Sequence, residues 1–141
     1  MKKIVLPVDG SDCALRATQH VINNLQHFAS GPELHLLNVQ PSLPNDVGRF
    51  ISADDLKRYH QDEAKKELQQ ARSALDAAGV KYQIHIVVGD PAQSIVRFAE
   101  EQGCGQIVMG THGRTGLAGA VMGSVATKVL HLSKVPVLVV K

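Results

Sequence analysis

Short apolar segments alternate with segments of helical periodicity along this chain, and this alternation restricts the fold more than any other feature. Five segments have the length and the apolar, β-branched character of buried strands: residues 3–8, 33–39, 82–88, 106–109 and 135–140. Four amphipathic helical patterns lie between them. Parallel strands need crossover connections of this kind, which are almost always right-handed. The sequence therefore predicts an α/β domain with a five-stranded, mostly parallel sheet flanked by about four helices.

Capping and stop signals set the expected limits of the helices. The first helical pattern runs from Ala14 to the stop signal at residues 31–32 (GP). Ser52 followed by Asp55 resembles a capping box before a long charged helix, and Asp90 followed by Pro91 favours another helix start. A last helix is expected over residues 124–132. Residues 40–50 are expected to form an irregular loop.

Length and composition exclude several classes of protein. The 141 residues suit one domain, residues 1–141. A net charge of +2, the absence of tryptophan and an aromatic content of 4% argue against a nucleic-acid partner. No apolar run is long enough for a membrane span, and the apolar stretch near the N-terminus is interrupted by Pro7 and Asp9, so it is interpreted as a strand. Cys13 and Cys104 are isolated, which favours a reducing cytoplasm over a disulfide framework or a zinc site.

The loops after the first and fourth strands are the expected functional site, because ligands of parallel α/β sheets bind at the carboxyl ends of strands where the strand order reverses. Asp9 follows the first strand, and the glycine-rich segment GTHGRTGLAGAVMGSVA, residues 110–126, follows the fourth. Amides at Gly110 and Gly113, and at the helix start marked by Gly123 and Ser124, suit a phosphate. Glycine-rich loops also serve plain turn-making in such folds.

The glycine-rich segment matches neither of two common phosphate-binding fingerprints. A P-loop requires a lysine after its last glycine, whereas Ser124 and Val125 follow Gly123 here. The dinucleotide pattern GxGxxG is absent after the first strand, where the sequence reads DGSD. A P-loop NTPase and an NAD-binding Rossmann domain are therefore disfavoured.

The spacing of Gly110, Gly113, Gly123 and Ser124 instead resembles the motif of the universal stress protein family, in its ATP-binding branch. The opening KKIVLPVDGS, the strand LHLLNVQP, the stretch GDPAQSIVRFAEE, the loop IVMGTHGRTG and the closing VPVLVV also look like segments of that family. The resemblance implies a single-domain, three-layer α/β sandwich that is Rossmann-like, of the adenine nucleotide alpha hydrolase type. It further implies ATP binding with Mg²⁺ or Mn²⁺ held through the phosphates, and a homodimer formed through the last strand.

The resemblance also implies roles for individual residues. Asp9 is placed to meet the ribose or the adenine, with Pro7 and Val8 beside the base, and the main chain of Val39 reads the adenine edge. Met109 and Gly110 lead into the phosphate site. The residues implied to line the phosphates are Gly113, Arg114, Gly123, Ser124 and Val125. The chain departs from many relatives at residues 118–120 (AGA), where basic residues are frequent.

Plainer interpretations exist for several of these residues. Asp9 or Ser124 can act as a helix cap, and Ser124 can serve a phosphate with the same hydroxyl. His112 has no paired carboxylate in sequence, so it is kept outside the expected site. The apolar edge formed by Val135 to Val140 is covered either by a second subunit across a two-fold axis or by a helix or loop of the same chain.

These observations predict an ATP-binding stress-response or regulatory module with at most slow hydrolysis or autophosphorylation. No catalytic residue and no protein metal ligand is assigned. One alternative is a phosphoryl- or nucleotidyl-transfer enzyme that uses Asp9, His112 and a bound metal. The other is a structural, dimeric interaction module without physiological ATP binding.

Overall fold

The computed structural model describes residues 2–25, 31–112 and 122–141. Within them, strands and helices alternate as the sequence predicts. The elements in chain order are β1 (Lys3–Pro7), α1 (Asp12–Asn24), β2 (Glu33–Gln40), α2 (Asn45–Gly48), α3 (Ala53–Ala77), β3 (Gln83–Val88), α4 (Pro91–Glu101), β4 (Gln106–Gly110), α5 (Ser124–Leu132) and β5 (Val137–Val140).

The five strands form one sheet in the order β3-β2-β1-β4-β5, and every pairing is parallel. The chain adds β2 and β3 on one side of β1 and then returns to add β4 and β5 on the other. Val5 shows this central position of β1, because it pairs with His35 of β2 and with Ile107 of β4. The strand order therefore reverses between β1 and β4, which is where ligands of such sheets bind.

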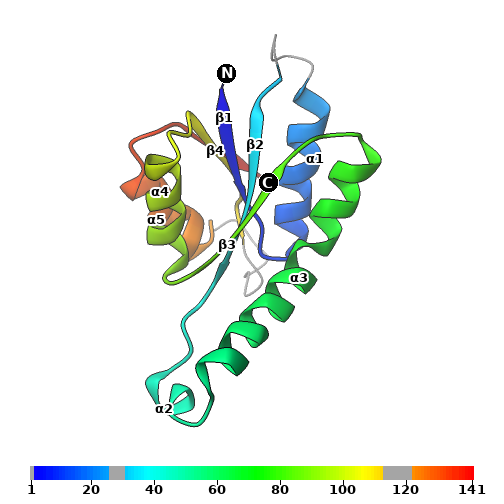
Figure 1. Ribbon diagram of the computed structural model, residues 1–141. Helices are drawn as coiled ribbons and strands as arrows, with labels where there is room; N and C mark the ends of the chain where they lie inside the picture. The colour runs from blue at the N-terminus through cyan, green and yellow to red at the C-terminus, as the bar shows by residue number, and fades with distance from the viewer. Residues whose placement is uncertain (1, 26–30, 113–121) are drawn as a thin grey trace.

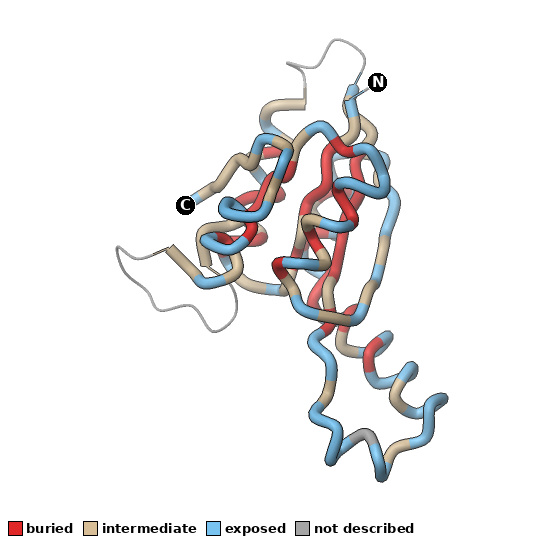
Figure 2. The backbone as a smooth tube through the Cα atoms, turned by 90° about the vertical axis from the view of Figure 1, so that its left-hand side faces the viewer, coloured by how far each residue is buried: buried red, intermediate tan, exposed pale blue. Residues whose placement is uncertain are grey.

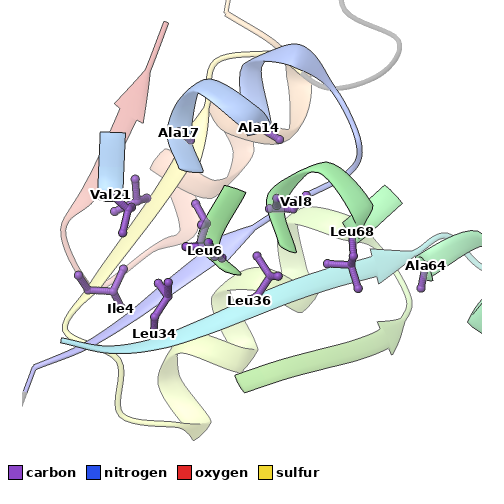
Figure 3. Close-up of a cluster of buried hydrophobic side chains, with 13 residues drawn as sticks. Ile4, Leu6, Val8, Ala14, Ala17, Val21, Leu34, Leu36, Ala64 and Leu68 are labelled. Carbon is purple, nitrogen blue, oxygen red and sulfur yellow. The ribbon is translucent and has the colours of Figure 1, made fainter. Parts of the chain in front are cut away.

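Helices cover both faces of the sheet and make the predicted three layers. Figure 1 shows α1 and α3 on one face and α4 and α5 on the other. Alternate residues of β1 supply the two cores: Ile4 and Leu6 belong to the cluster under α1 and α3, shown in Figure 3, whereas Val5 belongs to the cluster under α4 and α5. This alternation follows from the two-residue period of a strand whose two faces are both buried.

Side-chain caps begin three of the helices. Ser52 Oγ accepts from the amide of Asp55 at 3.1 Å, and the Asp90 carboxylate accepts from the amide of Gln93 at 3.0 Å, so both predicted caps are confirmed. Ser11 caps α1, where its hydroxyl accepts from the amide of Ala14 at 3.1 Å. Helix α1 therefore starts at Asp12, two residues before the predicted start.

The segment predicted as an irregular loop contains a fifth helix, α2, of one turn. Pro44 precedes it, and a backbone bond from Val47 N to Pro44 O of 3.0 Å closes the turn. Helix α2 and the first half of α3 extend beyond the sheet and are mostly exposed (Figure 2). No helix in the described part of the chain has the length and apolar character needed to cross a membrane.

The last strand begins at Val137, two residues later than predicted. The Ser133 hydroxyl accepts from the Val135 amide at 3.1 Å and donates to the Val135 carbonyl at 2.8 Å, and this local turn keeps Val135 out of the ladder.

Candidate functional site

A cleft of about 240 Å³ lies at the carboxyl ends of the strands, next to the reversal of strand order between β1 and β4. Three helix starts contribute residues to its wall: Ser11 and Ala14 from α1, Pro91 and Ile95 from α4, and Val125 and Ala126 from α5. Each helix begins with amides that have no partner within the helix and with the positive end of its dipole. The arrangement therefore favours an anionic group in the cleft.

The turn between β1 and α1 places one carboxylate in the wall of the cleft. Asp9 lines the cleft, and its Oδ1 accepts from the amide of Ser11 at 3.0 Å. Gly10 turns the chain with a φ of +83°, a conformation that glycine adopts without strain. Asp9 does not cap α1, since Ser11 has that role, so the interpretation of Asp9 as a helix cap is wrong.

The end of β4 approaches α1 closely at Gly110. A Cβ at this position would lie 2.7 Å from the carbonyl carbon of Cys13, which no real Cβ tolerates. Glycine is therefore required at 110 by the packing of backbone against backbone, independently of any ligand. Just beyond it, Thr111 Oγ1 lies 2.9 Å from His112 Nδ1, and the Ser11 hydroxyl lies 3.4 Å from the His112 carbonyl, to which it donates.

At the start of α5, one amide of the expected phosphate site is bonded within the protein. The amide of Gly123 donates to the carbonyl of Thr111 at 2.7 Å, so this N–H joins the two ends of the loop and does not face a ligand. Gly123 is the N-cap residue and Ser124 is the first residue of α5, so the interpretation of Ser124 as the cap is wrong. Neither residue lines the described cleft, whereas Val125 does.

Most of the predicted site residues that the structure describes come together in this cleft. Those that line it are Pro7, Val8, Asp9, Val39, Met109, Gly110 and Val125. Gly113 and Arg114 lie outside the described residues.

Sequence reasoning did not include a second set of lining residues in the expected site; of these, only His112 was considered, and it was kept outside. These are Ser11, Ala14, Leu37, Pro41, Pro91, Ile95, Thr111, His112 and Ala126. The predicted cap at Asp90 was the available signal for α4, because it marks the helix whose first turn, with Pro91, reaches the cleft. No comparable signal marks Ile95 or Ala126, whose apolar side chains resemble any other core residue in sequence.

The chemistry of the wall is mainly apolar, with a few polar groups. Asp9, the hydroxyls of Ser11 and Thr111 and the imidazole of His112 are the polar side-chain groups that line it. Within the described ranges, no three His, Cys, Asp or Glu residues are grouped in a way that could hold a metal ion. A bound divalent ion would therefore take most of its ligands from the phosphates of a bound molecule and from water, as Mg²⁺ commonly does.

The groups with a shifted pKa lie away from the cleft. Burial, and secondly the charge of His35, lower the pKa of His85. His35 Nδ1 lies 2.9 Å from His85 Nε2, and His35 Nε2 lies 3.0 Å from Glu33. Burial also raises the pKa of the Cys104 thiol. Neither His85 nor Cys104 lines the cleft, so these shifts concern stability and thiol reactivity.

Comparison with known proteins gives a consistent result for the whole chain. Residues 1–141 match the family model described as the universal stress protein family. Universal stress protein MJ0531 of Methanocaldococcus jannaschii is 38% identical over 143 residues, which cover 99% of this chain and 82% of that protein.

Two solved structures are similar over nearly their full length. That of MJ0577, from the same archaeon, has a TM-score of 0.83 and 37% identity, and the match covers 99% of this chain and 95% of the other. The universal stress protein from Archaeoglobus fulgidus in complex with dAMP has a TM-score of 0.71 and 27% identity, with 100% and 98% covered. With its five-stranded parallel sheet and this match over all of its residues, the chain belongs to the universal stress protein family.

Proposed function

We propose that this protein binds ATP in the cleft and acts as a nucleotide-dependent regulatory module in a stress response, with at most slow hydrolysis. The observation that carries the proposal is the cleft itself: mainly apolar walls, one carboxylate and the starts of three helices meet where the strand order reverses. Binding of an adenine nucleotide by a family member, the dAMP-bound protein of Archaeoglobus fulgidus, supports it.

Each part of the nucleotide has a suitable environment in the cleft. The side chains of Pro7, Val39 and Met109 provide apolar surface for the base. The Asp9 carboxylate accepts hydrogen bonds from the ribose hydroxyls. The first amides of α5, from Ser124 onward, and the proposed partners Gly113 and Arg114 are suited to the phosphates.

A divalent ion, Mg²⁺ or Mn²⁺, would be held through the phosphates, with Asp9 and the hydroxyls of Ser11 and Thr111 as the protein oxygens within the wall. When bound, the ion neutralises phosphate charge. No lysine lines the described cleft, and this supports slow turnover, since no side chain of the P-loop type clamps the β- and γ-phosphates.

Identification of any co-purified ligand is the first test of this proposal. Protein purified without added nucleotide is denatured, and released small molecules are identified by mass spectrometry. The stripped protein is then titrated with Mg-ATP by calorimetry. Release of ATP, or saturable binding of one ATP per chain, supports the proposal; absence of both overturns it.

Replacement of the cleft carboxylate tests the assignment of the site. Asp9→Ala removes a charged hydrogen-bond acceptor and is expected to weaken binding roughly 10- to 100-fold. Asp12→Ala is the matched control, because Asp12 is an exposed acid in the first turn of α1 and does not line the cleft. An equal effect of the two changes would remove Asp9 from the proposed site.

We also propose that two copies pair through β5 in the cytoplasm. β5 is the last strand of the sheet, and its four residues are all partly exposed. The carbonyl of Pro136 accepts from Ile107 of β4 and that of Val140 accepts from Thr111, one residue beyond β4, so the two-residue period directs the backbone groups of Val139 toward the free edge. Both cysteines are free and buried, which supports a reducing compartment.

Val139→Pro tests this pairing, because proline removes an N–H that faces outward. Light scattering after size exclusion is expected to give the mass of two chains for the unchanged protein and of one chain for the variant. A single-chain mass for the unchanged protein contradicts the dimer.

A further inference from the structure

A continuous buried chain of polar side chains connects α3 with the turn after β1. Asn38 and Gln40 of β2 and Glu67 of α3 are only 0, 3 and 9% exposed. Gln40 Nε2 donates to Asn38 Oδ1 at 2.8 Å and to Glu67 Oε2 at 2.7 Å. Asn38 Nδ2 in turn donates to the carbonyl of Val8 at 2.8 Å, one residue beyond the end of β1.

The chemistry of the groups fixes the orientation of both amide side chains in this network. Glu67 Oε2 accepts from the amide nitrogen of Gln40, because the amide oxygen of Gln40 has no hydrogen to donate. The two hydrogens of that nitrogen serve Glu67 and the carbonyl oxygen of Asn38. The amide group of Asn38 is thereby oriented with its nitrogen toward the Val8 carbonyl. Buried networks in which every member is satisfied hold a unique geometry.

The same elements hold the turn after β1 at a second point. Gly10 packs against α3 so closely that a Cβ on it would lie 3.2 Å from the Cα of Glu67. In Figure 3, Val8 lies beside the part of α3 that carries Leu68, and both belong to one buried cluster. Asp9 therefore sits between two fixed neighbours, Val8 and Gly10, and lines the cleft from that position.

We infer that Asn38, Gln40 and Glu67 are positioning residues for the nucleotide site, which hold the backbone of residues 8–10 so that the Asp9 carboxylate faces the ligand. The inference rests on the proposed function. None of the three residues lines the described cleft, so their effect on binding passes through Asp9. Helix α3, whose first half extends away from the sheet, thus supports the ligand site through a side chain in its second half.

A double-mutant cycle tests this role. Asn38→Asp keeps the size of the side chain but replaces the donor to the Val8 carbonyl with an acceptor. In the otherwise unchanged protein it is expected to weaken Mg-ATP binding about tenfold, an effect within the ordinary range for residues in one network. In the Asp9→Ala background the same change is expected to alter affinity less than about twofold, because the contact that it positions is already absent.

Gln40→Met is the second variant, since it keeps the length of the side chain and removes the group that orients Asn38. If circular dichroism shows that Asn38→Asp does not fold, Gln40→Met takes its place in the cycle. The same pattern of affinities is expected. Loss of stability alone would lower affinity equally in both backgrounds, and that outcome overturns the positioning role while leaving the proposed function intact. Failure of the unchanged protein to bind Mg-ATP would overturn both.

Discussion

The close approach of β4 to α1 makes a quantitative prediction for Gly110→Ala. The added Cβ would lie 2.7 Å from two atoms of Cys13 and 2.8 Å from its carbonyl oxygen, whereas ordinary contacts begin at 3.4 Å. The strand and the helix must therefore separate by roughly 0.7 Å, because backbone atoms cannot rotate away as a side chain can. Both elements are packed into the core, which does not yield without losing contacts elsewhere.

We expect this substitution to lower the free energy of unfolding by about 3 kcal/mol, the upper part of the range for overpacked cores. For a chain of this length that loss corresponds to a fall in Tm of roughly 6–12 °C. Thermal and urea unfolding followed by circular dichroism measure both quantities.

Gly105→Ala is the matched control for this substitution. Neither Gly105 nor Gly110 has a positive φ, and the nearest atom to a Cβ at 105 is the flexible Cγ of Lys2 at 3.6 Å. The control is expected to change stability by less than about 0.5 kcal/mol. If Gly110→Ala unfolds at the same midpoint as Gly105→Ala, the packing argument for Gly110 is refuted.

Three further predictions concern positions outside the cleft. Because the folded chain lowers the pKa of His85 below its ordinary value of 6.5, the unfolded chain binds that proton more readily, so stability falls as the pH falls below about 6.5. His85→Gln should flatten this dependence of Tm on pH and the exposed His131→Gln should not. Burial raises the pKa of Cys104, so its thiol should react with iodoacetamide at pH 7.5 only after unfolding, and rapid labelling of the native protein would contradict this. Asp90→Ala removes the cap of α4 and should lower stability by about 1 kcal/mol, whereas Asp90→Ser should retain most of it; equal losses in urea unfolding would argue against a capping role.

Elements with strong local signals were predictable from the sequence. Strands β1 and β4 are apolar and β-branched on both faces because both faces are covered, and helix starts at Ser52 and Asp90 depend on local hydrogen bonds. Helix α2 was missed because one turn held by Pro44 has too few residues for any periodicity. The start of α1 was placed late because the helical pattern was counted from its apolar residues, and the first helical residue, Asp12, precedes them.

The candidate site was predictable at the ends of β1 and β4 and at the start of α5, and not at the starts of α1 and α4. Asp9 and Gly110 follow from the rule that ligands bind at the carboxyl ends of strands next to a reversal of order, whereas Met109 was expected from the family resemblance. Pro91 and Ile95 reach the same cleft because α4 lies on the face of the sheet beside α5. This contact joins segments that are far apart in the sequence, so the sequence does not indicate it. The network of Asn38, Gln40 and Glu67 is hidden in the same way, since its members become neighbours only after α3 packs on β2.

The glycine spacing that carries the family resemblance combines structural and ligand roles. Gly110 is required by the backbone of α1, so it needs no phosphate to explain it. The Gly123 amide is bonded to Thr111, a bond that any residue except proline could make. Their joint effect is nevertheless to bring the start of α5 to the end of β4, where unpaired helix amides suit an anion. Loss of binding after substitution of Gly110 is therefore no evidence of direct phosphate contact. A change that leaves the backbone in place, such as Asp9→Ala, is the more informative test of the site.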